Sequence, residues 1–249
     1  MKCIRHALMS GKSLPTDSSL QESLRGALFP PEEQTVNEND PYYQHTLEIL
    51  EESYLEADAR GDVAGGSGSG GGLERWESKR RVLVDALDHD GSWLDVGCAN
   101  GLLMETLATW AREKGLRIEP YGLELSPRIA DAARRRLPRW ADRISTGNVM
   151  TWEPQMRFDY VTVIADSVPA TARPDLVERL ITRFLSSTGR LIFSIYMPRP
   201  PEAPAELPPA SAVLKRFGYR VKGEAEVRID GELKVSTAWL DVTSARPSP

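Results

Sequence analysis

The chain of 249 residues lacks the features that mark several specialised protein classes. It has only two cysteines, Cys3 and Cys98, which lie far apart and argue against a disulfide framework. Its three histidines are scattered without metal-ligand spacing, so we predict no metal site. No apolar run approaches the roughly 18 residues of a membrane span, and charged residues interrupt the short apolar patch at the N-terminus. With neither a membrane helix nor a secretory signal visible, we expect a cytoplasmic protein.

An excess of basic residues is also missing. The formal net charge is -5, within a composition that is 41% apolar and 27% charged, as in an ordinary globular protein. This acidic balance gives no general attraction to nucleic acid or to anionic membranes, so neither is expected as a partner. The oligomeric state is left open by the sequence.

Two segments precede the main domain. Residues 1–40 are rich in Ser, Pro, Glu and Asn without periodicity, and predict a poorly ordered extension. Residues 41–72 form the second segment, in which apolar positions at helical spacing predict a helix over 41–60. The glycine- and serine-rich tract over 61–72 is either an inert linker or a hinge that lets this helix close as a lid. The main domain is expected over 73–245.

Strands and helices alternate through the main domain, which is typical of a doubly wound α/β sheet. Residues 74–90 predict a first helix with one apolar face and with Lys79, Arg80 and Arg81 reaching water. The predicted strands span 92–96, 118–125, 142–148, 158–165 and 189–197. Helices are predicted over 102–114, from Pro127 onward with Ser126 as N-cap, over 174–185, and before Tyr219. Residues 220–242 then predict a hairpin turning at Asp230 and Gly231, so the sheet should be mixed with one antiparallel strand.

The stretch WLDVGCANGLL, residues 93–103, places a glycine-rich turn at the carboxyl end of the first strand. Ligands bind at this edge of open α/β sheets. Gly97 and Gly101 let the backbone approach a ligand, and the following helix offers free N–H groups to an anionic part of it. Glu124 ends the second strand, 23 residues after Gly101, a distance that suits a carboxylate accepting hydrogen bonds from two ribose hydroxyls.

In their order and spacing, LDVGCANG and YGLEL resemble the first two motifs of class I S-adenosylmethionine-dependent methyltransferases, in particular stand-alone bacterial ones. The resemblance covers roughly residues 73–242 and implies a Rossmann-like, seven-stranded mixed sheet with a C-terminal antiparallel hairpin. It also implies S-adenosylmethionine as cofactor, with Asp95, Gly97 and Gly101 shaping the methionine end and Glu124 holding the ribose. The full set of residues implied to bind the cofactor is Asp95, Gly97, Cys98, Ala99, Gly101, Glu124, Leu125, Asn148 and Val149.

This sequence departs from the family pattern at two positions. Ala99 replaces the middle glycine of the turn, and Asn148 stands where an aspartate often contacts the adenine amino group. The amide oxygen of Asn148 can still accept that hydrogen bond. A structural alternative is that Asp95 and Glu124 are only strand-end carboxylates. A nicotinamide cofactor is disfavoured, because the turn lacks the G-x-G-x-x-G order.

The methyl acceptor is less defined by the sequence. Asp166, after the fourth strand, is the best-placed residue to orient or deprotonate an acceptor, although it could equally be a solvated loop residue. His45 is a second candidate base, with a plain surface position as the alternative. Residues 41–60 and 197–209 should rim the acceptor site with aromatic, proline and acidic residues, so we expect a small-molecule acceptor. The alternatives are an RNA- or protein-directed methyltransferase and a non-catalytic module that binds S-adenosylmethionine.

Overall fold

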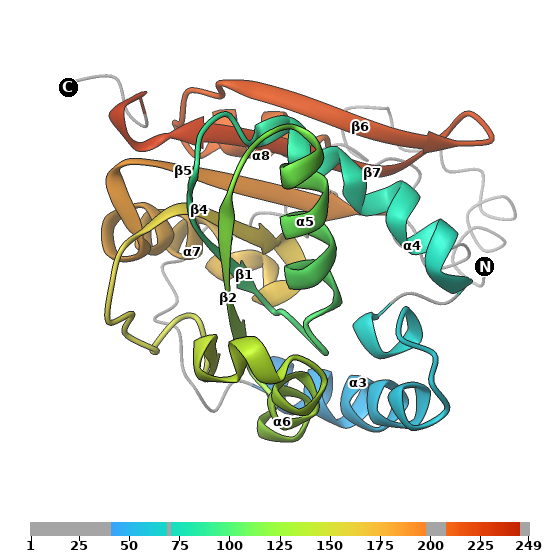
Figure 1. Cartoon of the computed structure of the whole chain (residues 1–249). Helices are drawn as coiled ribbons and strands as arrows, with labels where there is room; N and C mark the ends of the chain where they lie inside the picture. The colour runs from blue at the N-terminus through green and yellow to red at the C-terminus, as the bar shows by residue number, and fades with distance from the viewer. Residues whose placement is uncertain (1–40, 69–70, 198–207, 245–249) are drawn as a thin grey trace, which may run out of the picture.

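The structure, a computed structural model, describes residues 41–68, 71–197 and 208–244. The extension predicted over 1–40 and most of the proline-rich rim predicted over 197–209 lie outside the described residues. A seven-stranded sheet in the order β3-β2-β1-β4-β5-β7-β6 forms the centre of the molecule (Figure 1). Its strands are β1 (Gly91–Val96), β2 (Ile118–Glu124), β3 (Ile144–Thr146), β4 (Phe158–Ile164), β5 (Leu185–Tyr196), β6 (Gly223–Ile229) and β7 (Glu232–Asp241).

The strand directions match the predicted mixed sheet. Strands β3, β2, β1, β4 and β5 are mutually parallel, and β7 runs antiparallel to both β5 and β6. The β6–β7 turn contains Asp230 and Gly231, both with positive φ, as the sequence predicted. The predicted fold class is therefore confirmed.

Helices cover both faces of this sheet. The α-helices are α3 (Pro41–Ala59), α4 (Gly72–Arg80), α5 (Leu102–Glu113), α6 (Pro127–Arg136), α7 (Arg173–Arg179) and α8 (Ala210–Arg216). One buried apolar cluster joins the sheet to α5, to α6 and to the segment after α4, and a second joins the opposite face to α7 and α8. Ser126 caps α6 as predicted, because its Oγ accepts the Ile129 N–H at 3.1 Å.

Three predicted elements are shorter or less regular than the sequence indicated. The helix predicted over 174–185 is divided into α7 and a π-helix, η6 (Leu180–Phe184). The helix predicted over 74–90 is divided into α4 and a 3₁₀ helix, η2 (Arg81–Ala86). The strand predicted over 142–148 is reduced to Ile144–Thr146, because a 3₁₀ helix, η3 (Pro138–Arg143), precedes it. The prediction that Arg80 reaches water is wrong. Arg80 is only 8% exposed, because its side chain packs against Ser67 and Tyr196 of neighbouring elements.

The glycine-rich tract is ordered where the structure describes it. It contains a short 3₁₀ helix, η1 (Gly65–Ser67), that packs against α3. A Cβ at Gly66 would lie 2.8 Å from Nδ2 of Asn100, so the tract approaches the β1–α5 turn too closely for a larger residue. Asn100 Nδ2 also donates to the Val63 carbonyl oxygen at 2.9 Å. The tract is therefore not an inert linker in this conformation.

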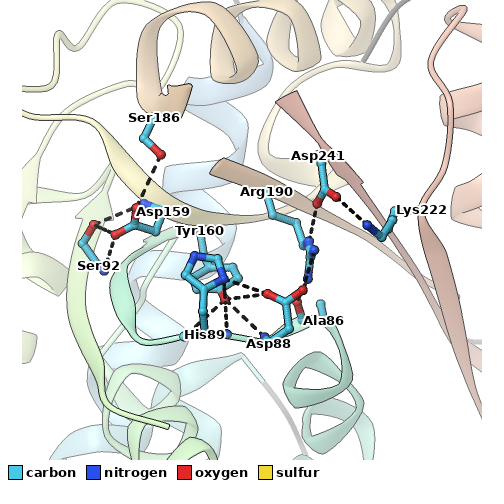
Figure 2. Close-up of polar contacts among 10 residues, drawn as sticks. All are labelled: Ala86, Asp88, His89, Ser92, Asp159, Tyr160, Ser186, Arg190, Lys222 and Asp241. Atoms are coloured by element: carbon cyan, nitrogen blue, oxygen red, sulfur yellow. Dashed lines mark hydrogen bonds and ion pairs between the residues drawn. The ribbon is translucent and has the colours of Figure 1, made fainter. Parts of the chain in front are cut away.

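A polar network fastens the amino ends of the central strands, at the opposite end of the sheet from the β1–α5 turn (Figure 2). Arg190 of β5 donates to Asp241 of β7 at 2.6 Å and to Asp88 at 2.8 Å. The hydroxyl of Tyr160, on β4, accepts the backbone N–H groups of Asp88 and His89. The network therefore connects β4, β5 and β7 to the loop that enters β1.

Candidate cofactor and acceptor site

A cavity of about 360 Å³ lies at the carboxyl ends of β1, β2 and β4. Its floor is the β1–α5 turn, and its sides include the ends of β2 and β5 and the loop after β3. Helix α3 and the glycine-rich tract contribute the remaining wall. The cavity therefore occupies the edge of the sheet where the sequence predicted ligand binding.

The β1–α5 turn uses three consecutive odd-numbered positions with positive φ. Gly97 has φ 78°, Ala99 has φ 48° and Gly101 has φ 76°. Gly97 lines the cavity, and a Cβ there would meet only Ser167 Oγ within 4 Å, at 3.8 Å. Gly101 does not line the cavity; a Cβ there would lie 2.6 Å from Leu137 Cδ1, so this glycine shapes the turn by close packing.

Glu124 is buried at the cavity wall, with 8% of its surface exposed. Its Oε2 accepts the Ala99 N–H at 2.9 Å, and its Oε1 accepts the Ser126 N–H at 3.0 Å. Burial raises the pKa of Glu124, while the backbone N–H groups oppose that shift. Each carboxylate oxygen retains a further lone pair for a ligand donor.

The other cofactor residues predicted from the motif occupy different positions around the cavity. Leu125, Asn148 and Val149 all line it, as does the backbone segment containing Cys98. The Cys98 side chain is buried close to Gly122, and burial raises its pKa well above the ordinary value. Oδ1 of Asn148 already accepts the Met150 N–H at 2.9 Å, so one lone pair of this amide oxygen is used by a local turn.

Asp95 and Arg80 line the same cavity, and both residues are buried. Asp95 is the penultimate residue of β1 and is 5% exposed, and burial raises its pKa to about 8 despite the nearby charge of Arg80. Arg80 is the functional candidate that the sequence interpretation missed. Its position in a run of basic residues on a polar helix face gave no signal that the glycine-rich tract and Tyr196 of β5 would contact it.

Helix α3 closes one side of the cavity with few buried contacts of its own. Only Tyr43 and Ala57 are buried among its 19 residues. Glu51 connects α3 to α6, since its Oε2 accepts a 2.5 Å hydrogen bond from Ser126 Oγ and its Oε1 pairs with Arg128 at 2.7 Å. Figure 1 shows α3 lying beside α6. The helix is thus held over the cavity largely by polar contacts.

The two candidate acceptor residues are not brought together. Asp166 lines the cavity, but its carboxylate pairs with Arg173 at 3.2 Å and its side chain is 63% exposed. His45 is exposed on α3 and is absent from the cavity lining within the described residues. Tyr42, which the sequence interpretation gave no role of its own, lines the cavity and donates to the Asp166 carbonyl oxygen at 2.5 Å.

The described parts of the chain contain no group of three or more His, Cys, Asp or Glu side chains that could hold a metal ion. None of their helices combines the length and apolarity needed to cross a membrane.

Comparison with known proteins identifies the fold through structure. No protein-family model matches the sequence, and a comparison with curated proteins also gives no match. Among solved structures, coclaurine N-methyltransferase, bound to N-methylheliamine and S-adenosylhomocysteine, is 14% identical with a TM-score of 0.57, covering 89% of this chain and 71% of that chain. The 1,6-didemethyltoxoflavin-N1-methyltransferase of Burkholderia thailandensis, bound to its acceptor and S-adenosylhomocysteine, is 17% identical with a TM-score of 0.53, covering 85% and 93%. The chain has the class I methyltransferase fold.

The class I fold does not by itself fix the reaction. The [4+2]-cyclase SpnF is also similar, at 17% identity and a TM-score of 0.50, covering 72% of this chain and 74% of that chain. The similarities support S-adenosylmethionine as cofactor, because the two methyltransferase neighbours above were crystallised with S-adenosylhomocysteine. The reaction must therefore be argued from the site.

Proposed function

We propose that this protein is a methyltransferase that uses S-adenosylmethionine to methylate a small-molecule acceptor. The observation that carries the proposal is the buried Glu124 beside the glycine turn, at the carboxyl ends of β1 and β2. In a class I sheet, this edge is where the cofactor is expected to bind.

The residues present fit that cofactor. Glu124 offers free lone pairs for two ribose hydroxyls, and the missing side chain of Gly97 leaves open space above the turn. Leu125, Asn148 and Val149 would contact the adenine end, with Ala99 and the Cys98 backbone completing the turn. When bound, S-adenosylmethionine supplies a methyl group on a positively charged sulfur, and the chain's own residues then need chiefly to orient the acceptor.

Asp166 is the residue that we propose to orient the acceptor. Its carboxylate pairs with Arg173 at 3.2 Å, and this engagement favours positioning of the acceptor over proton abstraction. His45 receives no role in the proposal, since it lies outside the cavity lining. We further propose that residues 41–72 act as a lid on the domain that follows, because α3 closes the cavity through a few polar contacts.

The cavity lining favours a small acceptor. Helix α3 and the glycine-rich tract form one wall of the cavity and limit the approach of a large polymer from that side. The neighbours with bound ligands methylate, according to their names, coclaurine and a didemethyltoxoflavin, both small molecules. Four acidic side chains and one guanidinium line the cavity, so it offers little positive charge to the phosphate groups of a nucleic acid.

Methyl transfer from radiolabelled S-adenosylmethionine tests the proposal. The protein would be incubated with a small-molecule extract of its host, and separately with total RNA, DNA and protein. We expect the label in the small-molecule fraction and its loss in the Glu124→Ala variant. Saturable, salt-sensitive labelling of RNA or DNA alone would support the nucleic-acid alternative, and labelling of protein alone a protein acceptor. No transfer to any fraction, despite cofactor binding, would favour a non-catalytic module.

A further inference from the structure

The two edges of the sheet differ in how far they are open to a further strand. At one edge, β3 has only three residues, and Arg134 donates to the Ile144 carbonyl oxygen at 2.8 and 3.0 Å. At the other edge, β6 has seven residues and, among the described strands, pairs only with β7 (Figure 1). The outer edge of such a strand presents backbone N–H and C=O groups that another strand can pair with. The β6 edge is therefore the one that can accept a partner.

Strand β6 keeps a regular alternation along this edge. Its odd-numbered residues over 223–229 are half-buried, whereas Glu224, Glu226 and Arg228 are exposed. The irregularity in the β6–β7 pairing lies on β7, where Lys234 is the extra residue without a partner on β6. The outer edge of β6 is thus continuous enough to form a ladder with another strand.

The exposed row of β6 carries charges in an order that complements itself when the strand is reversed. Glu224 and Glu226 are negative, and Arg228 is positive. In an antiparallel pair of two β6 strands centred on Glu226, Glu224 of each copy lies opposite Arg228 of the other. Lys222, just before the strand, then comes opposite Asp230 in the β6–β7 turn. Opposite charges placed across a strand pair in this way are stabilising.

The same charges disfavour the neighbouring registers. Centring the pair on Ala225 brings Glu224 opposite Glu226, and centring it on Val227 brings Glu224 opposite Asp230. A parallel pair in register sets every charge opposite its own copy. Like charges directly opposite each other destabilise a strand pair. The charge order of β6 therefore selects the antiparallel register centred on Glu226.

The contacts within one chain suit this arrangement. Within the described residues, no hydrogen bond or ion pair reaches the carboxylate of Glu224. Arg228 donates to Glu226 of its own strand at 2.9 Å, which offsets the repulsion between the two Glu226 carboxylates at the centre of the pair. A guanidinium has five N–H donors, so Arg228 can hold Glu226 and also reach Glu224 of the second copy.

We propose that the β6 edge is a dimer interface, through which two copies of this chain join their sheets by antiparallel pairing of residues 223–229 about a two-fold axis at Glu226. On the half-buried side, Ala225 then faces Val227 of the second copy, so apolar side chains also meet across the axis. Residues of β6 are not among those that line the cavity, so the dimer leaves the proposed cofactor site open. The inference does not depend on the reaction that the protein catalyses.

Sedimentation velocity of the full chain at several concentrations tests the interface. The parent should form a concentration-dependent dimer. Arg228→Glu puts like charges opposite each other at two symmetric positions and should raise the dimer dissociation constant by about tenfold or more. Combining Glu224→Arg with Arg228→Glu restores both pairs with reversed sign, so the dimer should return. Arg112→Glu changes an exposed arginine on α5 by the same charge and should associate like the parent.

Cysteine crosslinking tests the register itself. The two copies of residue 226 meet at the axis, whereas the two copies of residue 224 lie four positions apart, roughly 14 Å and beyond the reach of a disulfide. In a Cys3→Ser chain, Glu226→Cys should therefore form a disulfide-linked dimer on mild oxidation, and Glu224→Cys should not. The remaining native cysteine, Cys98, is buried.

Each result decides for or against the interface. A parent that sediments as a monomer at every concentration would overturn the proposal. So would a dimer that Arg228→Glu leaves unchanged, or one that the double charge reversal fails to restore. Equal crosslinking at positions 224 and 226 would contradict the register centred on Glu226. Circular dichroism checks that each variant is folded, and the crosslinking result stands even if Arg228→Glu is not.

Discussion

Tyr42 and Asp166 are 124 positions apart in the sequence, yet the Tyr42 hydroxyl donates a 2.5 Å hydrogen bond to the Asp166 carbonyl oxygen. This bond joins the first turn of α3 to the segment that follows β4, and both residues line the cavity. Burial, the charge of Asp166 and the neighbouring ring of Tyr43 raise the pKa of Tyr42 to about 12, although Arg173 opposes the shift, so the phenol remains a donor at neutral pH. The proposed lid is therefore fastened at one end by a neutral hydrogen bond.

Removing that bond should loosen the start of α3. In Tyr42→Phe, the loss of about 0.5 to 1.5 kcal/mol would speed local opening several-fold. Hydrogen exchange of the backbone amides over 41–59 would increase, while exchange in β1 and β4 stays unchanged. Unchanged protection of α3 in this variant would show that the bond does not hold the helix in place.

Glu51 should fasten the middle of the same helix. Glu51→Gln replaces the charged acceptor shared by Ser126 and Arg128, and we expect faster dissociation of S-adenosylhomocysteine in stopped-flow displacement. Glu52→Gln is the matched control, because Glu52 is exposed, lies on the same helix and meets Arg128 only at 3.5 Å. Equal dissociation rates in the two variants would contradict a latch at Glu51.

Cofactor affinity should depend on pH through Asp95. Burial raises the pKa of Asp95 to about 8. The charge of Arg80 opposes this shift and that of Glu124 adds to it, so the carboxyl group of Asp95 is protonated at neutral pH in the cofactor-free protein. The family resemblance puts Asp95 at the methionine end of the cofactor, whose ammonium group requires a charged carboxylate, so affinity for S-adenosylhomocysteine should rise between pH 6 and 8, by up to about tenfold per pH unit. Titrations at several pH values would measure the slope. Asp95→Asn should give a flat profile, and a parent profile as flat as that variant's would disprove the linkage.

The two roles of Gly97, allowing positive φ in the turn and leaving space for the cofactor, can be tested separately. Gly97 and Gly115 have similar φ angles, 78° and 80°, but only Gly97 lines the cavity. Alanine at either position should destabilise folding by about 1 to 2 kcal/mol through left-handed strain. Chemical denaturation would measure this loss, and titration should show weaker cofactor binding only for Gly97→Ala. Equal cofactor affinity of the two variants would argue against close contact at Gly97.

The network around Arg190 should make stability fall in acid (Figure 2). Burial opposes ionisation of Asp88, but hydrogen bonds from His89 and Arg190 outweigh it and lower the pKa of Asp88 to about 2; the pKa of Asp241 is lowered as well. A lowered carboxyl pKa contributes stability above the unfolded value near pH 4, and this stability is lost as the pH falls toward 2. Arg190→Met should destabilise the protein by about 3 to 5 kcal/mol at pH 7 and reduce the further loss at pH 3. Urea denaturation at both pH values measures this, and an equal acid loss in parent and variant would exclude the network as its source.

Much of the fold could be predicted because local signals and tertiary structure agree. The Asp230–Gly231 turn, the Ser126 cap and the strand before Gly97 all depend on short-range chemistry that the sequence displays. The position of Glu124 at the cavity also follows from strand order, since parallel neighbours end at the same edge.

The surroundings of Arg80 and His45 could not be predicted, because they depend on long-range packing that the local hydrophobic pattern does not show. Arg80 looked like a solvated helix residue, but its surroundings come from Ser67, Trp76 and Tyr196, the first and last on other elements. His45 looked like a residue of the acceptor rim, but the rotation of α3 leaves it exposed. Which face of α3 turns toward the cavity could not be predicted, because that helix has no strongly apolar side.

The most direct test of the central claim is a calorimetric comparison of S-adenosylhomocysteine with NADH. The parent chain should bind one equivalent of S-adenosylhomocysteine and no NADH. Glu124→Ala should lose about 1.5 to 3 kcal/mol of that binding free energy, because the ribose hydroxyls lose a charged acceptor. Glu119→Ala, an exposed glutamate on the same strand, should bind like the parent. Heat with NADH but none with S-adenosylhomocysteine, or equal affinity of the two alanine variants, would contradict the account.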